Sequence, residues 1–98
     1  MKIQKDQAFK IGPEVLFQQV SGEVVLLDMA SENYFGLDEV GTRIWSLIES
    51  GNNVDGIVDT LCQEYEVERD ILEGDVMELV SKLIDSGLVS PVPGGQAI

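Results

Sequence analysis

Few side chains in this 98-residue chain could do chemistry, and most of those are acidic. The chain has no histidine, the commonest general base and neutral metal ligand. Its single cysteine, Cys62, cannot form an internal disulfide, and its place on the apolar face of an expected helix indicates a buried small hydrophobe. The acids of residues 64–70 lack the spacing of an EF-hand. We therefore expect no enzyme, no bound metal and no cofactor.

The charge balance narrows the possible partners. Six basic residues stand against eighteen acidic ones, which gives a net charge of -12. Such a charge repels nucleic acid and anionic membranes, and it favours a neutral or basic peptide. The other interpretation is that the acids only keep a small protein soluble. No apolar run approaches the roughly 20 residues that span a bilayer, and the first residues lack the apolar segment of a signal peptide, so we expect a cytoplasmic protein.

The first half of the chain predicts an antiparallel meander of three strands. Residues 15–20, 23–29 and 34–37 are rich in β-formers and are separated by polar turns. The second run is apolar at nearly every position, which suits a strand covered on both faces or one in the middle of a small sheet. Pairing in sequence order leaves the first and third strands at the two edges. Gly36 either lets another backbone come close to the third strand or only ends that strand.

The second half predicts three helices. Asp38 is a good N-cap for the first helix, and Gly51 follows that helix as a stop. Asn53 can cap the second helix. The third helix is expected from about residue 68 to 86, with Gly87 as its stop. The expected fold class is α+β, with an N-terminal three-stranded antiparallel sheet packed on three α-helices.

The predicted domain lies between a flexible N-terminal arm and a disordered C-terminal tail. Residues 1–13 show no clear period, and we expect them to form a flexible N-terminal arm, of which Phe9 and Ile11 could pin a part. Residues 14–89 form the single domain. Residues 90–98 contain two prolines and two glycines, and we expect a disordered tail there.

The expected third helix carries a wide apolar arc. At 100° per residue the arc covers about 160°, whereas a surface helix needs little more than about 100°. The residues that form it are Leu72, Val76, Met77, Leu79, Val80, Leu83 and Ile84. The excess is either surface available to a ligand or a sign that two neighbours clasp the helix.

Two non-enzymatic functions fit these elements. In the first, an extended peptide adds to the open edge of the third strand, and the third helix supplies an apolar wall. In the second, the three helices and small sheet form a winged-helix DNA-binding regulator, which the negative charge disfavours. A carrier protein fits less well, because its serine should open a helix, whereas Ser31 lies in a turn between strands.

Several stretches of the chain form a recognisable ordered set: Leu26-Leu27-Asp28, residues 34–45, residues 61–67, Asp75-Val76, residues 79–83 and Gly87-Leu88-Val89. Taken together, they resemble the PqqD family of leader-peptide-binding domains. These domains are the recognition elements of pathways that make ribosomally synthesised, post-translationally modified peptides. The resemblance covers about residues 15–89. The junction GLDEVGTRIW, residues 36–45, looks most like that of the free-standing members in lasso-peptide clusters.

The resemblance implies a winged-helix-like domain that binds the leader of a precursor peptide as a fourth strand. The leader would lie along the third strand in a groove walled by the third helix. Residue by residue, the implied peptide-binding set is Asn33, Tyr34, Phe35 and Gly36 on the strand, with Asp75, Val76, Leu79, Val80 and Leu83 on the helix. Asp75 would bond or pair with a leader side chain, or it is a solvent-facing acid.

The resemblance also implies a role. We expect a non-catalytic bacterial adaptor that captures the leader peptide and presents it to modifying enzymes of its pathway. Those enzymes would be a leader peptidase and a cyclase, or a radical enzyme. Leu37, Ile44 and Trp45 match the family as well, and we assign them to the core.

Overall fold

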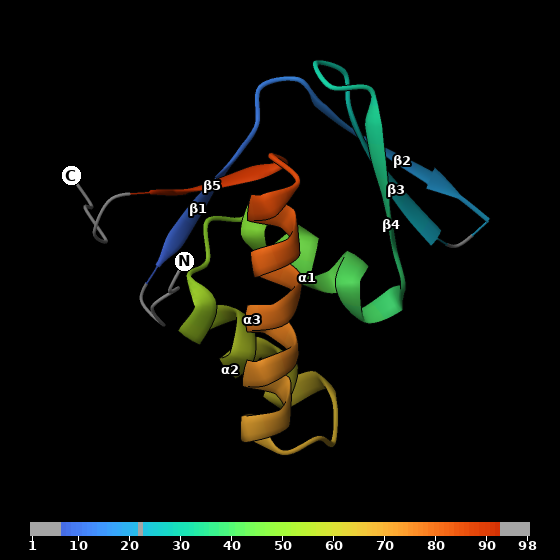
Figure 1. Cartoon of the computed structure of the whole chain (residues 1–98). Helices are drawn as coiled ribbons and strands as arrows, with labels where there is room; N and C mark the ends of the chain where they lie inside the picture. Colours follow the sequence, from blue (N-terminus) through green and yellow to red (C-terminus); the bar gives the residue numbers. More distant parts are fainter. Residues whose placement is uncertain (1–6, 22, 93–98) are drawn as a thin grey trace.

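The computed structural model describes residues 7–21 and 23–92, and its helices form one continuous block of the chain between strands (Figure 1). The strands before the helices are β1 (Ala8–Ile11), β2 (Val15–Val20), β3 (Glu23–Asp28) and β4 (Asn33–Leu37). The helices are α1 (Glu39–Glu49), α2 (Val54–Glu64) and α3 (Arg69–Asp85), and β5 (Val89–Val92) follows them. The predicted α+β class is confirmed.

The strands β2, β3 and β4 form one antiparallel sheet in sequence order. The turn before β4 is held by Asp28, whose carboxylate accepts hydrogen bonds from the Ala30 N–H (3.2 Å) and the Ser31 hydroxyl (2.9 Å). Glu32 completes this turn with a φ of 63°, in the left-handed region. The predicted meander with β2 and β4 at its edges is therefore confirmed.

The two faces of this sheet differ in burial. Val24, Leu26 and Leu37 are buried on the inner face, where the sheet contacts α1. On the outer face, Val25 and Leu27 of the middle strand are only half-buried. The apolar run of β3 thus belongs to the middle of a small sheet and not to a strand covered on both faces.

Side chains cap the first two helices as the sequence predicts. An Asp38 carboxylate oxygen accepts from the Gly41 N–H at 2.8 Å, and the Asn53 side-chain oxygen accepts from the Gly56 N–H at 2.8 Å. These bonds satisfy backbone donors that have no partner inside the helix. The stops at Gly51 and Gly87 adopt φ values of +91° and +77°, which glycine reaches without steric cost.

The two ends of the described chain differ from the prediction, because they pair with each other. The strands β1 and β5 form a separate antiparallel sheet in which Phe9 lies opposite Pro91. The Gly12 N–H donates to the Leu88 carbonyl at 2.9 Å, and Phe9 is buried in the core. Four-residue strands have no readable period, and a proline is tolerated in an edge strand. Residues 1–6 and 93–98 of the predicted arm and tail lie outside the described residues.

One core joins these layers. It is built from the inner face of the β2–β3–β4 sheet, the buried faces of the three helices, Phe9 of β1 and Val89 of β5. Trp45 on α1 is its largest fully buried side chain. The assignment of Leu37, Ile44 and Trp45 to the core is confirmed. Among the described residues, none of the helices is both long and apolar enough to cross a membrane.

Candidate functional site

A groove lies between β4, the first turns of α1 and the middle of α3. Its volume is about 520 Å³. Phe35 and Gly36 form its strand side, and Asp75 and Leu79 belong to its helix side. In Figure 1, β4 is the strand of its sheet that lies nearest to α3. The remaining lining residues are Leu37, Asp38, Val40, Gly41, Ile44, Glu78 and Lys82.

A smaller hollow continues along β4 in the other direction. It has a volume of about 240 Å³ and lies between the start of β4 and the segment that follows α3. Phe35 lines both hollows, so they meet at this side chain. We call the two together the β4–α3 groove. The residues of the smaller hollow are Glu32, Asn33, Tyr34, Phe35, Ser86 and Leu88.

The hydrogen-bond pattern between β2 and β3 shows which way the main chain of β3 points. The Met29 N–H donates to the Glu14 carbonyl at 2.9 Å, just outside the paired residues Val15 and Asp28. In an antiparallel ladder, residue pairs that exchange hydrogen bonds alternate with pairs that do not. Because Glu14 and Met29 are bonded, the next pair, Val15 and Asp28, exchanges no hydrogen bonds of its own. We infer that the main-chain groups of Asp28 point away from β2, toward β4.

This alternation identifies the free main-chain groups of β4. Asn33 lies opposite Asp28, so Asn33 and every second residue after it point their N–H and C=O groups toward β3. The residues between them, Tyr34 and Gly36, point these groups outward along the open edge of the sheet. An unpaired row of donors and acceptors on an edge strand is a template for another strand.

The structure separates the predicted site residues into two sets. Asn33, Tyr34, Phe35, Gly36, Asp75 and Leu79 all line the β4–α3 groove. Val76, Val80 and Leu83 are instead fully buried in the core, where no peptide could contact them without a rearrangement of α3. They hold α3 against the domain and so position the residues that line the groove.

Sequence reasoning missed part of the groove. Glu78 and Lys82 lie on α3 at the same face as Asp75 and Leu79, and helical spacing from Asp75 points to both. Val40 and Gly41 come from the first turn of α1, which the sequence placed only in the scaffold. Ser86 and Leu88, which lie between the end of α3 and the start of β5, line the smaller hollow.

The walls of the groove carry more negative than positive charge. Asp38, Asp75 and Glu78 line the larger hollow, and among residues 7–21 and 23–92 the only cation that lines it is Lys82. The Lys82 ammonium lies 3.7 Å from a Glu78 carboxylate oxygen, so part of its charge is already compensated. Asp75 and Glu78 are exposed, so a basic ligand side chain can pair with them at the rim while water still reaches them. The groove therefore favours a neutral or basic ligand.

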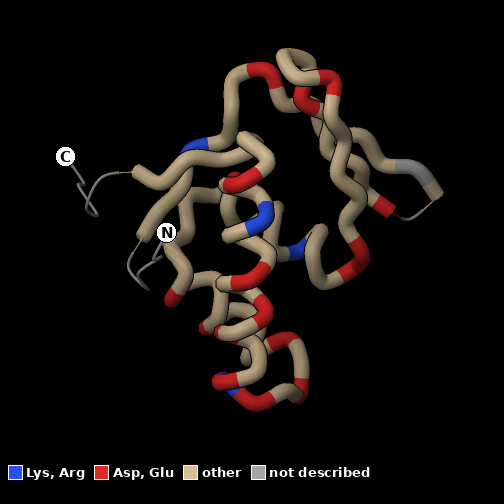
Figure 2. The backbone as a smooth tube through the Cα atoms, viewed as in Figure 1, with Lys and Arg blue, Asp and Glu red and all other residues tan. Residues whose placement is uncertain are grey.

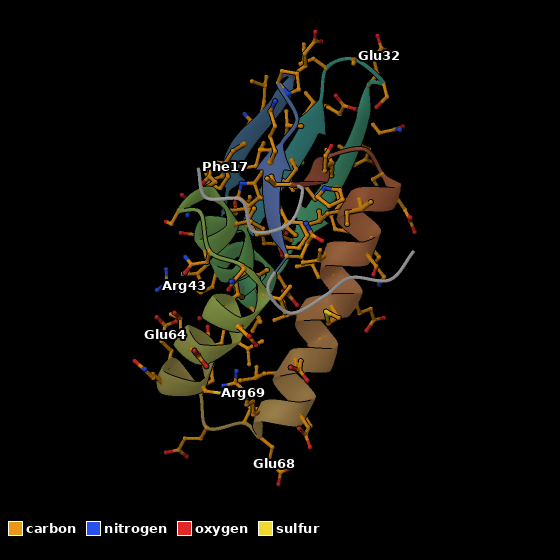
Figure 3. All side chains as sticks on the ribbon, turned by 90° about the vertical axis from the view of Figure 1, so that its left-hand side faces the viewer. Phe17, Glu32, Arg43, Glu64, Glu68 and Arg69 are labelled. Carbon is orange, nitrogen blue, oxygen red and sulfur yellow. The ribbon has the colours of Figure 1, made fainter. Side chains whose placement is uncertain are left out.

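No group of three metal-ligating side chains gathers anywhere in residues 7–21 and 23–92. The ion pairs of these residues lie on other surfaces or at the rim of the groove. The bidentate bond of Arg43 to Glu64 joins α1 to the end of α2 (Figure 3). This bond lowers the pKa of the Glu64 carboxyl and raises the pKa of the Arg43 guanidinium. What the groove offers is thus an open strand edge, apolar side chains and acidic rims.

Residues 23–89 match the family model described as coenzyme PQQ synthesis protein D (PqqD). This match includes β3, β4, all three helices and the start of β5. The chain belongs to the PqqD family. A search of the curated proteins found no match.

Two solved structures resemble this PqqD-family chain over most of its length. The first is TbiB1 in complex with the TbiA(beta) leader peptide, with 40% sequence identity and a TM-score of 0.78. That alignment covers 91% of this chain and 99% of that chain. The second is a lasso peptide synthetase B1 complexed with the leader peptide, with 32% identity and a TM-score of 0.72 over 85% of this chain and 98% of that chain.

Proposed function

We propose that this PqqD-family protein is a non-catalytic adaptor that binds the leader of a ribosomally made precursor peptide. The leader adds to the open edge of β4 as an extra antiparallel or parallel strand, in the β4–α3 groove. The observation that carries the proposal is the combination of outward-pointing main-chain groups at Tyr34 and Gly36 with a groove beside them that offers apolar side chains and acidic rims. The two structurally similar proteins, both in complex with leader peptides, support it.

Main-chain hydrogen bonds along β4 and apolar contacts in the groove contribute differently to the binding free energy. Each main-chain hydrogen bond contributes only about 0.5–1.5 kcal/mol net, so four bonds at Tyr34 and Gly36 give about 2–6 kcal/mol. Association itself costs about 4–15 kcal/mol. Apolar side chains of the leader must therefore bury surface against Phe35 and Leu79. The hydrogen bonds fix the register of the peptide, and these contacts supply most of the affinity.

The bound peptide is presented to modifying enzymes of the same pathway. Tethering raises the local concentration of the substrate at the enzyme, so a modest leader affinity is sufficient. A leader peptidase and a cyclase are the partners we favour over a radical enzyme, because one of the similar solved structures is a lasso peptide synthetase B1. We place the protein in the cytoplasm, where precursor peptides are made. The net charge of -12 argues against a DNA-binding role.

Amide hydrogen exchange followed by NMR tests strand addition directly. The ligand is the synthetic leader of the precursor encoded beside this gene, and a scrambled leader is the control. We expect the Tyr34 and Gly36 amides to gain protection, while the Phe35 amide, which points into the existing ladder, changes little. Protection gained instead along β2, the other edge of the sheet, would overturn the proposed site.

A further inference from the structure

The outer face of the β2–β3–β4 sheet carries a row of large apolar side chains. The register places Leu16, Leu27 and Tyr34 side by side across the three strands. Leu16 is 51% exposed and Tyr34 is 77% exposed. Val25 lies in the next row, between Gln18 and Gly36, and is half-buried. We call this surface, with Met29 at its end, the outer sheet face.

This face is unusual for a sheet in contact with solvent. A solvated face of an antiparallel sheet normally carries polar side chains, with the apolar ones turned toward the core. The helices lie against the opposite side of the sheet (Figure 1), and Met29 next to the row is 52% exposed. Contiguous exposed apolar surface with a polar rim marks an interaction site.

The charges around the face determine what kind of partner fits. Residues 14–38 contain five acids and no lysine or arginine. In Figure 2 every charged position along the described backbone of β2, β3, β4 and their turns is accordingly acidic. A second copy of this chain would bring the same acids against them, which is unfavourable. A partner with lysine and arginine around an apolar centre is favoured. The five acids are Glu14, Glu23, Asp28, Glu32 and Asp38.

We propose that the outer sheet face docks a folded protein whose contact surface is apolar at its centre and basic at its rim. Resting on the proposed function, we identify this partner as the enzyme that acts on the bound leader peptide. Tyr34 belongs both to this face and to the edge strand where the peptide adds. The peptide and the enzyme would therefore contact adjacent surfaces, and the sheet itself would hold them next to each other.

The test uses Leu16, which lies on β2, at the opposite edge of the sheet from β4. Leu16→Lys removes an apolar contact and adds a charge that repels a basic rim, at an edge position where lysine is well tolerated. The matched control is Ile71→Lys, because Ile71 on α3 is similarly exposed, at 54%, and lies away from the sheet. The probe is the purified leader peptidase encoded beside this gene. Calorimetry in the presence of the leader measures the dissociation constant of the complex between the peptidase and this protein.

We expect Leu16→Lys to raise the dissociation constant for the peptidase about tenfold or more, because the variant loses an apolar contact and sets a cation against the partner's basic rim. Ile71→Lys should leave this constant unchanged. Leu16→Thr, which keeps a β-forming residue without the charge, should give a smaller loss and provides the test if the lysine variant fails to fold. An unchanged constant for the Leu16 variants, or an equal loss in Ile71→Lys, would overturn the docking surface.

Two further measurements separate this inference from the proposed function. Leader affinity, measured without the peptidase, should be the same in the wild type and in Leu16→Lys. If the wild type fails to bind the leader at all, the proposed function fails, whatever the Leu16 variants show. If sedimentation shows a wild-type dimer that Leu16→Lys converts to a monomer, the face is a self-association surface and the inference is wrong.

Discussion

Leu79 and Val80 are neighbours on α3 with different surroundings. Leu79 is half-buried and lines the β4–α3 groove. We expect Leu79→Asp to weaken leader binding about tenfold or more, because it places a charge against an apolar peptide side chain. Ile71→Asp, the same change at an exposed site on the same helix, should leave affinity unchanged. Calorimetry with the leader peptide measures the affinity of both variants. Equal affinity for wild type and Leu79→Asp would rule out contact between Leu79 and the leader.

The same substitution at the next residue should act on stability instead. Val80 is completely buried, so Val80→Asp places an unpaired carboxylate in the core. Such a charge costs several kcal/mol, against a total stability of about 5–15 kcal/mol for a small domain. Urea unfolding followed by circular dichroism should show a protein that is largely unfolded or far less stable. Native stability in this variant would contradict the position of α3.

The contrast between these two residues shows how far a sequence pattern can predict the site. Helical periodicity correctly identified a wide apolar arc on the third helix. A role for that arc in peptide binding is implied only by the family resemblance, and it stays a prediction. Periodicity cannot say which part of the arc neighbouring elements cover. Val76, Val80 and Leu83 are covered and Leu79 is only partly so, because the packing of α3 on the rest of the domain decides this.

At the scale of elements, β4 offers a test of main-chain recognition. A Cβ at Gly36 would meet no atom within 4 Å, so Gly36→Ala should fold normally and keep its N–H on the open edge. Gly36→Pro removes that N–H, at an edge position where proline is tolerated. We expect the proline variant to bind the leader about tenfold more weakly than the alanine variant, from a lost hydrogen bond and altered edge geometry. Equal binding by the two variants, measured by calorimetry, would exclude a main-chain bond at this residue.

The link between α1 and α2 predicts a pH dependence of stability. The bond to Arg43 lowers the pKa of Glu64 in the folded protein below its ordinary value of 4.5. The unfolded chain therefore binds a proton more readily, so the contribution is present above about pH 4.5 and is lost as the pH falls through the lower folded pKa. The stability difference between wild type and Glu64→Gln should be small, because the pair is exposed, and should vanish in acid. Urea unfolding at neutral and acidic pH measures it, and a difference that grows in acid would be inconsistent with this bond.

Local signals predicted the central elements well and the terminal ones poorly. The caps at Asp38 and Asn53 and the glycine stops act within a few residues, so the sequence alone identifies them. The pairing of β1 with β5 joins segments separated by nearly the whole chain, and no local pattern records it. The proline at position 91 read as a sign of disorder, although it occupies a short edge strand.

At the scale of the whole molecule, the pairing of β1 with β5 predicts a global role for Phe9. Its side chain is buried in the common core. We expect Phe9→Ala to lower the free energy of unfolding by about 3 kcal/mol or more, the usual cost of removing a buried aromatic ring. Lys10→Ala, an exposed neighbour in the same strand, serves as the control. Urea unfolding at neutral pH compares the two, and equal stability would mean that this strand is not part of the folded unit.

The net charge of -12 separates peptide binding from the DNA-binding role that the same set of elements could serve. With only six basic residues against eighteen acidic ones, this protein cannot displace many counterions of a duplex, so we expect no binding to random duplex DNA even at low salt. A lysine-bearing leader should bind through the same acidity, with an affinity that falls as salt is raised. Fluorescence anisotropy measures both, and replacing the leader lysines with glutamine should remove most of the salt dependence. Tight, salt-sensitive DNA binding would favour a DNA-binding regulator. If the glutamine peptide keeps the salt dependence of the original leader, then Asp38, Asp75 and Glu78 do not act on the leader's charge.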